Sequence, residues 1–201
     1  DVSVYGEFRQ AGETAFCGYT VLDATSTVLG LLVDGTSVDS VGSGQIAEVI
    51  LAETPLYAES GGQVADVGSL SGPSVRASVT DVQKPVPGLI SHTVRVDEGT
   101  LSVGEGVDVS VDRATRYEGQ RAHSATHLIH AALRDTLGPH ATQAGSLNRP
   151  GYLRLDFSWN QALTKDAQDA IGEISQNAIT QDLEVTTRIL PVAEAQEQGA
   201  M

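Results

Sequence analysis

The residues with the clearest capacity for chemistry are two histidines four positions apart, in the stretch His123-Ser124-Ala125-Thr126-His127. On a helix, positions i and i+4 share a face, so both imidazoles can reach one ion at a zinc–nitrogen distance of about 2.0 to 2.1 Å. The same spacing also arises by chance in helices that bind no metal. The zinc-protease version of the pattern has Glu directly after the first His, and Ser124 there argues against a protease.

Two further stretches combine small and amide side chains. Gly61 and Gly62 are consecutive glycines followed by Gln63. Glycines let the backbone approach a partner closely or take a positive φ, and an amide both donates and accepts, so this stretch is a candidate binding loop. Its alternative is a tight turn between strands. The polar stretch 141–147 contains Gln143, and its alternative role is a simple connector.

The first half of the chain must position the glycine stretch, and its pattern is that of antiparallel β structure. Between residues 18 and 112, short runs rich in Val and Thr are separated by turn signals such as Asp34-Gly35. Such runs without intervening helices are typical of barrels and sandwiches. We predict a small β-barrel, with strands at 27–33, 45–51, 75–82, 89–96 and 107–111.

The histidines lie in the strongest helical pattern of the chain, residues 115–137. Thr115 and Glu118 have the spacing of an N-terminal capping box, and Gly138 ends the run. At about 100° per residue, an apolar stripe that we expect to face the core lies opposite the histidines. The stripe is Ala125, Leu128, Ile129, Ala132 and Leu133, and the opposite face carries His123, His127 and His130.

After this helix the pattern alternates between strand and helix. Residues 152–159 alternate apolar and polar side chains as a half-buried strand does, Thr164 can cap a second helix, and residues 183–190 predict another strand. The expected fold class is α+β: an N-terminal antiparallel β-barrel (residues 1–113) followed by an α+β lobe with two helices on a sheet (residues 114–201).

Composition excludes several classes of protein. The chain has 201 residues, 40% of them hydrophobic, which is enough for a packed core. No run approaches the roughly 18 apolar residues of a membrane span, and the first thirty residues have no secretory signal pattern. The single Cys17 excludes a disulfide framework. We therefore expect a soluble, cytoplasmic protein with no membrane partner.

Charge is distributed unevenly. A net charge of −14 argues against a broad surface for nucleic acid, because phosphate binding depends on Lys and Arg. However, residues 113–154 hold six arginines against two acids, a net of +4, while the remainder carries −18. We expect this segment to face a nucleic acid; the alternative is a helix and loop with solvated arginines.

Taken together, these stretches closely resemble the editing region of bacterial alanyl-tRNA synthetases, in order and over nearly the whole chain. The motifs that carry the resemblance are Glu53 to Gly68, His123-Ser124-Ala125-Thr126-His127-Leu128, Gln143 to Leu147, and Leu153-Arg154-Leu155-Asp156-Phe157-Ser158.

The resemblance implies both a fold and an activity. The family's editing domain combines a β-barrel with an α+β lobe that threonyl-tRNA synthetases share, and it hydrolyses the aminoacyl ester of tRNA(Ala) wrongly charged with Ser or Gly. His123 and His127 match its zinc ligands. Thr126 and Gln143 match positions lining the amino-acid pocket and are the expected catalytic residues; the expected substrate-binding residues are Gly61, Gly62 and Gln63.

One departure from the family pattern concerns the metal. The family completes its zinc site with a Cys-x-x-x-His downstream of the stretch matching residues 194–201, and neither Cys17 nor His130 nor His140 fits that motif. No stretch resembles the ATP-binding aminoacylation core. We therefore expect a piece of a larger synthetase, with an incomplete zinc site, whose partners are the tRNA(Ala) acceptor end and the rest of the synthetase chain.

Two alternatives remain. One is a free-standing trans-editing aminoacyl-tRNA deacylase, against which the missing Cys-x-x-x-His counts. The other is a non-catalytic tRNA-binding module, which an incomplete metal site would suit.

Overall fold

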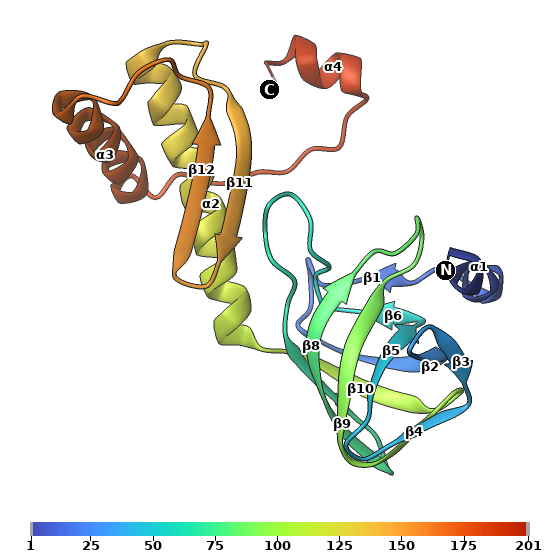
Figure 1. Cartoon of the computed structure of the whole chain (residues 1–201). Coiled ribbons are helices and arrows are strands. Elements are labelled where there is room, and N and C mark those ends of the chain that lie inside the picture. Colours follow the sequence, from blue (N-terminus) through green and yellow to red (C-terminus); the bar gives the residue numbers. More distant parts are fainter. Residues whose placement is uncertain (1, 200–201) are drawn as a thin grey trace.

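The structure, a computed structural model, describes residues 2–199; residue 1 and residues 200–201, at the outer ends of the two predicted domains, lie outside the described residues. A β-barrel and a second, α+β lobe are joined by the long helix α2 (Figure 1). The elements in chain order are α1 (Val2–Ala11), β1 (Ala15–Phe16), β2 (Asp23–Val33), β3 (Thr36–Val38), β4 (Ser40–Gly42), β5 (Ile46–Leu51), β6 (Glu53–Thr54), β7 (Gly68–Ser71), β8 (Val75–Gln83), β9 (Ser91–Ser102), β10 (Gly106–Val111), α2 (Arg113–Leu137), β11 (Gln143–Arg149), β12 (Tyr152–Phe157), α3 (Lys165–Thr180) and α4 (Val192–Glu197).

The barrel closes through antiparallel pairing in the order β10-β7-β8-β9-β5-β2, and β2 pairs back with β10. Closure leaves the six strands of the ring without a free edge. The short strands β3 and β4 pair with β2 and β9 from outside the ring. The predicted α+β class and N-terminal barrel are confirmed, and each of the five predicted strands overlaps an observed one.

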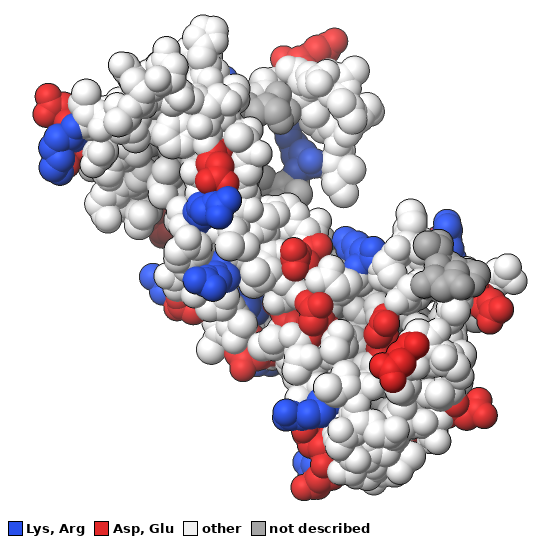
Figure 2. All heavy atoms as spheres, in the orientation of Figure 1, with Lys and Arg blue, Asp and Glu red and all other residues white. Residues whose placement is uncertain are grey.

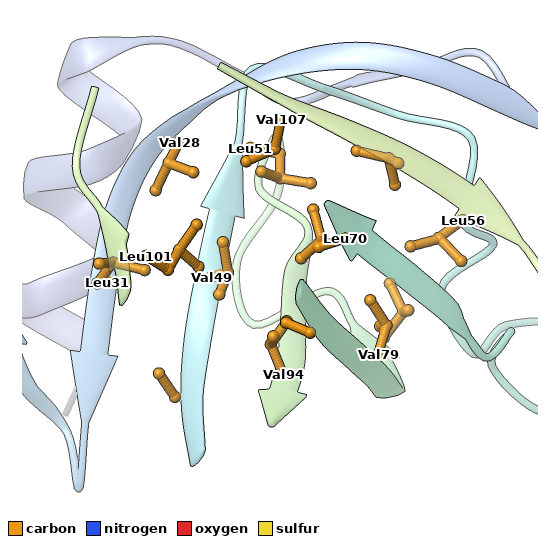
Figure 3. Close-up of a cluster of buried hydrophobic side chains, with 14 of the residues drawn as sticks. Val28, Leu31, Val49, Leu51, Leu56, Leu70, Val79, Val94, Leu101 and Val107 are labelled. Atoms are coloured by element: carbon orange, nitrogen blue, oxygen red, sulfur yellow. The ribbon is translucent and has the colours of Figure 1, made fainter. Parts of the chain in front are cut away.

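Alternation along the strands fills the barrel. In β8, Val75, Ala77 and Val79 point inward and are buried, whereas Arg76 and Thr80 are exposed. The inward side chains of the other strands meet them in one apolar cluster (Figure 3). This cluster supplies the main hydrophobic stabilisation of the barrel.

Helix α2 begins where β10 ends, next to the predicted boundary at residue 113. Its N-cap is Asp112, whose side chain accepts a 2.9 Å hydrogen bond from the backbone N–H of Thr115. The predicted capping box beginning at Thr115 is therefore wrong, because the helix starts earlier: Asp112, directly after β10, is the N-cap and already satisfies the N–H of Thr115. Gly138, with a φ of +102°, ends the helix as predicted.

The face of α2 that is buried differs from the predicted one. Ile129, Ala132 and Leu133 pack into the core of the second lobe. Ala125 is only half-buried, whereas Thr126 and His130, at 2% and 8% exposure, are buried. The prediction that His130 lies away from the packed face is wrong, because α2 contacts β11 and β12 as well as α3, so that more of its circumference than one apolar stripe is covered.

The second lobe packs the β11–β12 hairpin and α3 against α2 (Figure 1). Thr164 caps α3 as predicted, by accepting from the backbone N–H of Ala167 at 3.2 Å. The polar stretch considered as a connector instead contributes most of β11, which pairs with β12.

The predicted strand at 183–190 is wrong. Within the described residues this stretch is irregular, and Val185 and Ile189 are 92% and 97% exposed. A strand needs a neighbour to satisfy its backbone N–H and C=O groups, and the described sheet of this lobe consists of β11 and β12 alone.

Charged side chains of both signs are interspersed on the face shown in Figure 2, where much of the second lobe is uncharged. Within residues 2–199, no helix is long and apolar enough to cross a membrane.

Candidate functional site at the junction of the two lobes

The glycine stretch forms a tight turn that packs against β11 of the second lobe. Gly61 and Gly62 have φ values of +59° and +78°, and the backbones of Ser60 and Gln63 exchange hydrogen bonds of 3.0 and 3.2 Å. A Cβ on Gly62 would lie 2.2 Å from Oγ of Ser146. Glycine is thus required at position 62 both for its φ and for the closeness of β11.

Backbone hydrogen bonds hold this turn against β11. The N–H of Asn148 donates to the carbonyl of Gly62 at 2.6 Å, and the N–H of Val64 donates to the carbonyl of Asn148 at 3.0 Å. These two bonds join the barrel loop to the β11–β12 hairpin at this point.

The two histidines of the i, i+4 pair lie beside the turn. Their rings stack with centroids 5.1 Å apart and an interplanar angle of 17°. Nδ1 of His123 is 3.0 Å from Oε1 of Gln63. Because an amide oxygen only accepts, Nδ1 carries the proton and Nε2 keeps its lone pair. Burial, and then the neighbouring His127, lower the pKa of His123, which favours the neutral ring.

The expected pocket residues Gln143 and Thr126 also lie near the glycine turn and the two histidines, and together these residues form the site cluster. Nε2 of Gln143, on the exposed start of β11, donates to Oγ of Ser146 at 3.2 Å, beside Gly62. The buried Thr126 hydroxyl is 2.5 Å from Oδ1 of Asn148 and 3.1 Å from the carbonyl of Ala122. A ligand could reach Gln143 directly, whereas contact with Thr126 requires displacement of neighbouring groups.

All seven residues singled out in the sequence therefore gather where the barrel loop, α2 and β11 meet. They are Gly61, Gly62, Gln63, His123, Thr126, His127 and Gln143.

The cluster offers a metal two imidazoles. His123 Nε2 is free to ligate while its Nδ1 is held by Gln63, a common arrangement for ligating histidines. Within residues 2–199, however, no three His, Cys, Asp or Glu side chains converge as a metal site would need.

A hollow of about 190 Å³ opens beside the cluster, between the barrel and the first half of α2. It is lined by Tyr19, Tyr57, Gln63, Arg116, Gln120 and His123.

Comparison with known proteins gives the family. Residues 1–115 match the family described as tRNA synthetases class II (A). The chain belongs to the class II (A) tRNA synthetases.

Among curated relatives of this synthetase chain are alanine–tRNA ligases. That of Clavibacter michiganensis subsp. michiganensis is 54% identical over 201 residues, and that of Leifsonia xyli subsp. xyli is 56% identical over 201 residues. Both alignments cover all of this chain and 23% of the ligase. The chain thus spans less than a quarter of the length of these relatives. The resemblance to alanyl-tRNA synthetases is confirmed, and the assignment to their editing region stays a prediction.

Sequence analysis of this tRNA synthetase chain missed a buried ion pair that fixes α2 to the barrel. The Arg116 guanidinium lies 2.5 Å from the Asp66 carboxylate and donates to the carbonyls of Gly18 and Pro55 at 2.8 and 2.7 Å. Asp66 also accepts from the N–H of Tyr57 at 2.7 Å. An arginine among several on a helix carries no sequence signal that it will be buried.

Proposed function

We propose that this chain is the part of an alanine–tRNA ligase that hydrolyses the ester bond between tRNA(Ala) and a wrongly attached Ser or Gly. The observation that supports the proposal best is the contact of His123 with Gln63 and of the Gly62 turn with β11, which joins three motifs distant in sequence. The overall likeness to alanine–tRNA ligases agrees with it.

Such an activity answers a physical limit of amino-acid selection. A synthetic pocket sized for alanine excludes glycine by only about 1 to 3 kcal/mol, because one methyl group is missing. An added hydroxyl, as in serine, is also poorly rejected by an apolar slot. A second, hydrolytic site must therefore discriminate in the opposite sense.

Selectivity for serine would come from hydrogen bonding to its hydroxyl. Gln143 is exposed at the edge of the cluster, and Thr126 lies within it. Alanyl-tRNA would leave such polar groups unpaired, and sites of this kind discriminate by roughly 10⁴ to 10⁵.

His123 and His127 would hold a zinc ion, with its remaining ligands outside the part of the chain that the structure describes. Bound zinc supplies a Lewis acid or an activated water, or anchors the substrate amine. Gln63 fixes the proton of His123 on Nδ1 and so leaves its other nitrogen for the metal.

The tRNA acceptor end is the proposed partner of this junction. The basic segment 113–154 contributes less free charge than its composition implies, because four of its arginines are ion-paired with carboxylates: Arg113, Arg116, Arg121 and Arg154. Recognition must therefore rely on groups other than cations as well.

Hydrolysis of Ser-tRNA(Ala) and Ala-tRNA(Ala) by a full-length alanine–tRNA ligase carrying this sequence tests the proposal. Wild type should hydrolyse the serine ester and spare the alanine ester. Gln143→His and Thr126→Gly should reduce that preference, since the first replaces the Gln143 amide with an imidazole of different shape and hydrogen-bonding geometry and the second removes the Thr126 hydroxyl. An unchanged preference in both variants would remove these side chains from the account, and absence of wild-type hydrolysis would contradict the proposed function.

A further inference from the structure

The hollow beside His123 differs from the cluster in the chemistry of its walls. Two tyrosines, Tyr19 and Tyr57, line it together with the amides of Gln63 and Gln120. Aromatic faces with nearby amides are the groups with which proteins bind unstacked nucleobases, by stacking and by hydrogen bonds to base edges.

The one cation in the walls is already neutralised. Nε and Nη2 of Arg116 donate to the Asp66 carboxylate, Nη1 donates to the carbonyl of Gly18, and Nη2 also donates to the carbonyl of Pro55. A guanidinium committed in this way is a poor partner for a phosphate or a free carboxylate. The hollow therefore suits an uncharged, planar group.

Tyr19 is placed as a stacking platform. It is 85% exposed, and Phe16 packs edge-on against its ring with centroids 5.0 Å apart. Phe16 also contacts Tyr57 edge-to-face at 6.2 Å, and the Tyr57 hydroxyl donates to the carbonyl of Ser60 at 3.1 Å. Phe16 thus contacts both rings, while Tyr19 presents most of its surface to solvent.

We propose that this hollow binds the 3′-terminal adenine base of the tRNA, between Tyr19 and Tyr57, with the Gln120 amide facing the base edge. The inference rests on the proposed function, because that base is attached to the same ribose as the amino-acid ester. Gln63 and His123 line the hollow and also belong to the cluster, so the base and the ester would lie on adjacent sides of these two residues.

A second hollow of about 520 Å³ shares Tyr19, Arg116 and Gln120 with the first and extends past Tyr117 to Arg113. The two hollows are neighbours along the first turns of α2, and the preceding nucleotide of the single-stranded end would occupy the second one.

The test is a thermodynamic cycle between the side chain and the base. Two fluorescently labelled RNA hairpins with the acceptor-stem sequence, one ending in CCA and one lacking the final adenosine, are titrated with the 201-residue chain, and anisotropy gives each dissociation constant. The isolated chain is used because a whole ligase would also bind the terminal base where it aminoacylates. Wild type should lose roughly 5- to 150-fold in affinity when the adenosine is removed, the range of one base–aromatic stack.

Tyr19→Ala should bind both hairpins equally, because its stacking partner is gone, and Tyr19→Trp should restore the difference. Tyr152→Ala is the matched control: Tyr152 is an exposed tyrosine outside both hollows, and this variant should keep the wild-type difference. Equal binding of both hairpins by wild type, or an undiminished difference in Tyr19→Ala, would overturn the base site while leaving the hydrolytic proposal standing. Binding of neither hairpin would also overturn the base site, whereas the hydrolytic proposal is decided by the assay of the full-length ligase.

Discussion

The contacts of the site residues differ in which functional groups they leave available. Nδ1 of His123 contacts Gln63 while Nε2 stays available, and the lack of a side chain at Gly62 lets Ser146 lie close to the turn. Thr126 is the exception, since its hydroxyl is packed against Asn148. The junction is therefore sensitive to single-atom changes in ways that can be measured one residue at a time.

Gly62→Ala should destabilise the chain by about 1 to 3 kcal/mol more than Gly104→Ala. Both positions have φ near +80°, but a Cβ at 62 meets Ser146 at 2.2 Å, whereas nothing lies within 4 Å at 104. The difference in unfolding free energy from urea titration isolates the clash from the backbone strain that the two variants share. Equal losses of unfolding free energy in the two variants would show that β11 does not pack tightly against the turn.

Zinc should bind this chain weakly, because two imidazoles replace the three or four protein ligands usual for zinc. After dialysis against buffer, mass-spectrometric metal analysis should find clearly less than one zinc per chain. His123→Ala should reduce the residual binding and His140→Ala, on an exposed loop, should not. One tightly retained zinc per wild-type chain would contradict the expectation.

At the scale of elements, α2 is the part on which the site depends. It is capped at the end of β10, carries both histidines, and is bound to three barrel segments through Arg116. Arg116 and Thr126 are buried at the junction, while Ile129, Ala132 and Leu133 farther along form part of the core of the second lobe. One helix thereby sets the position of the barrel loop relative to β11.

Arg116→Met should cost about 3 to 5 kcal/mol of unfolding free energy, because it leaves the carboxylate of Asp66 buried without its partner. Arg121→Met is the matched control on the same helix. Its ion pair with Glu118 is exposed, so its loss should cost less than about 1 kcal/mol. Chemical denaturation measures the loss of unfolding free energy in each variant. Similar losses in both would argue against a stabilising role of the buried Arg116–Asp66 ion pair.

At the scale of the whole molecule, the closed barrel provides the stable base from which the junction is built. Its one histidine, His92, is fully buried, with Nδ1 2.9 Å from the carbonyl of Val49 and Nε2 2.8 Å from Oγ1 of Thr54. Burial lowers the pKa of His92 to about 4. Protonation of this ring is therefore linked to unfolding of the barrel.

Because the folded-state pKa of His92 lies below its unfolded value near 6.5, the unfolded chain takes up the proton first as pH falls. The contribution of His92 to stability should be full above pH 6.5 and decline toward pH 4, by roughly 3 kcal/mol in total. Urea unfolding at a series of pH values should show a steeper decline for wild type than for His92→Gln, which does not titrate. Parallel curves would contradict the assignment.

The sequence alone determined the local features of this protein. Period-two alternation of Val with polar residues places the barrel strands, and Thr164 and Gly138 mark a helix start and a helix end, because these signals act between residues close in the chain. The resemblance to alanyl-tRNA synthetases also follows from sequence alone. The seven candidate site residues were named from their types and from that resemblance.

Only the tertiary structure decided which of these local features meet. Gln63 and His123 are 60 residues apart, and nothing in their spacing fixes a 3.0 Å contact. Arg116 is buried because it contacts Gly18, Pro55 and Asp66 of the barrel half. The run at 183–190 is not a strand because the described part of the chain provides no partner for its backbone. Burial and pairing depend on neighbours distant in sequence, so periodicity could not predict them.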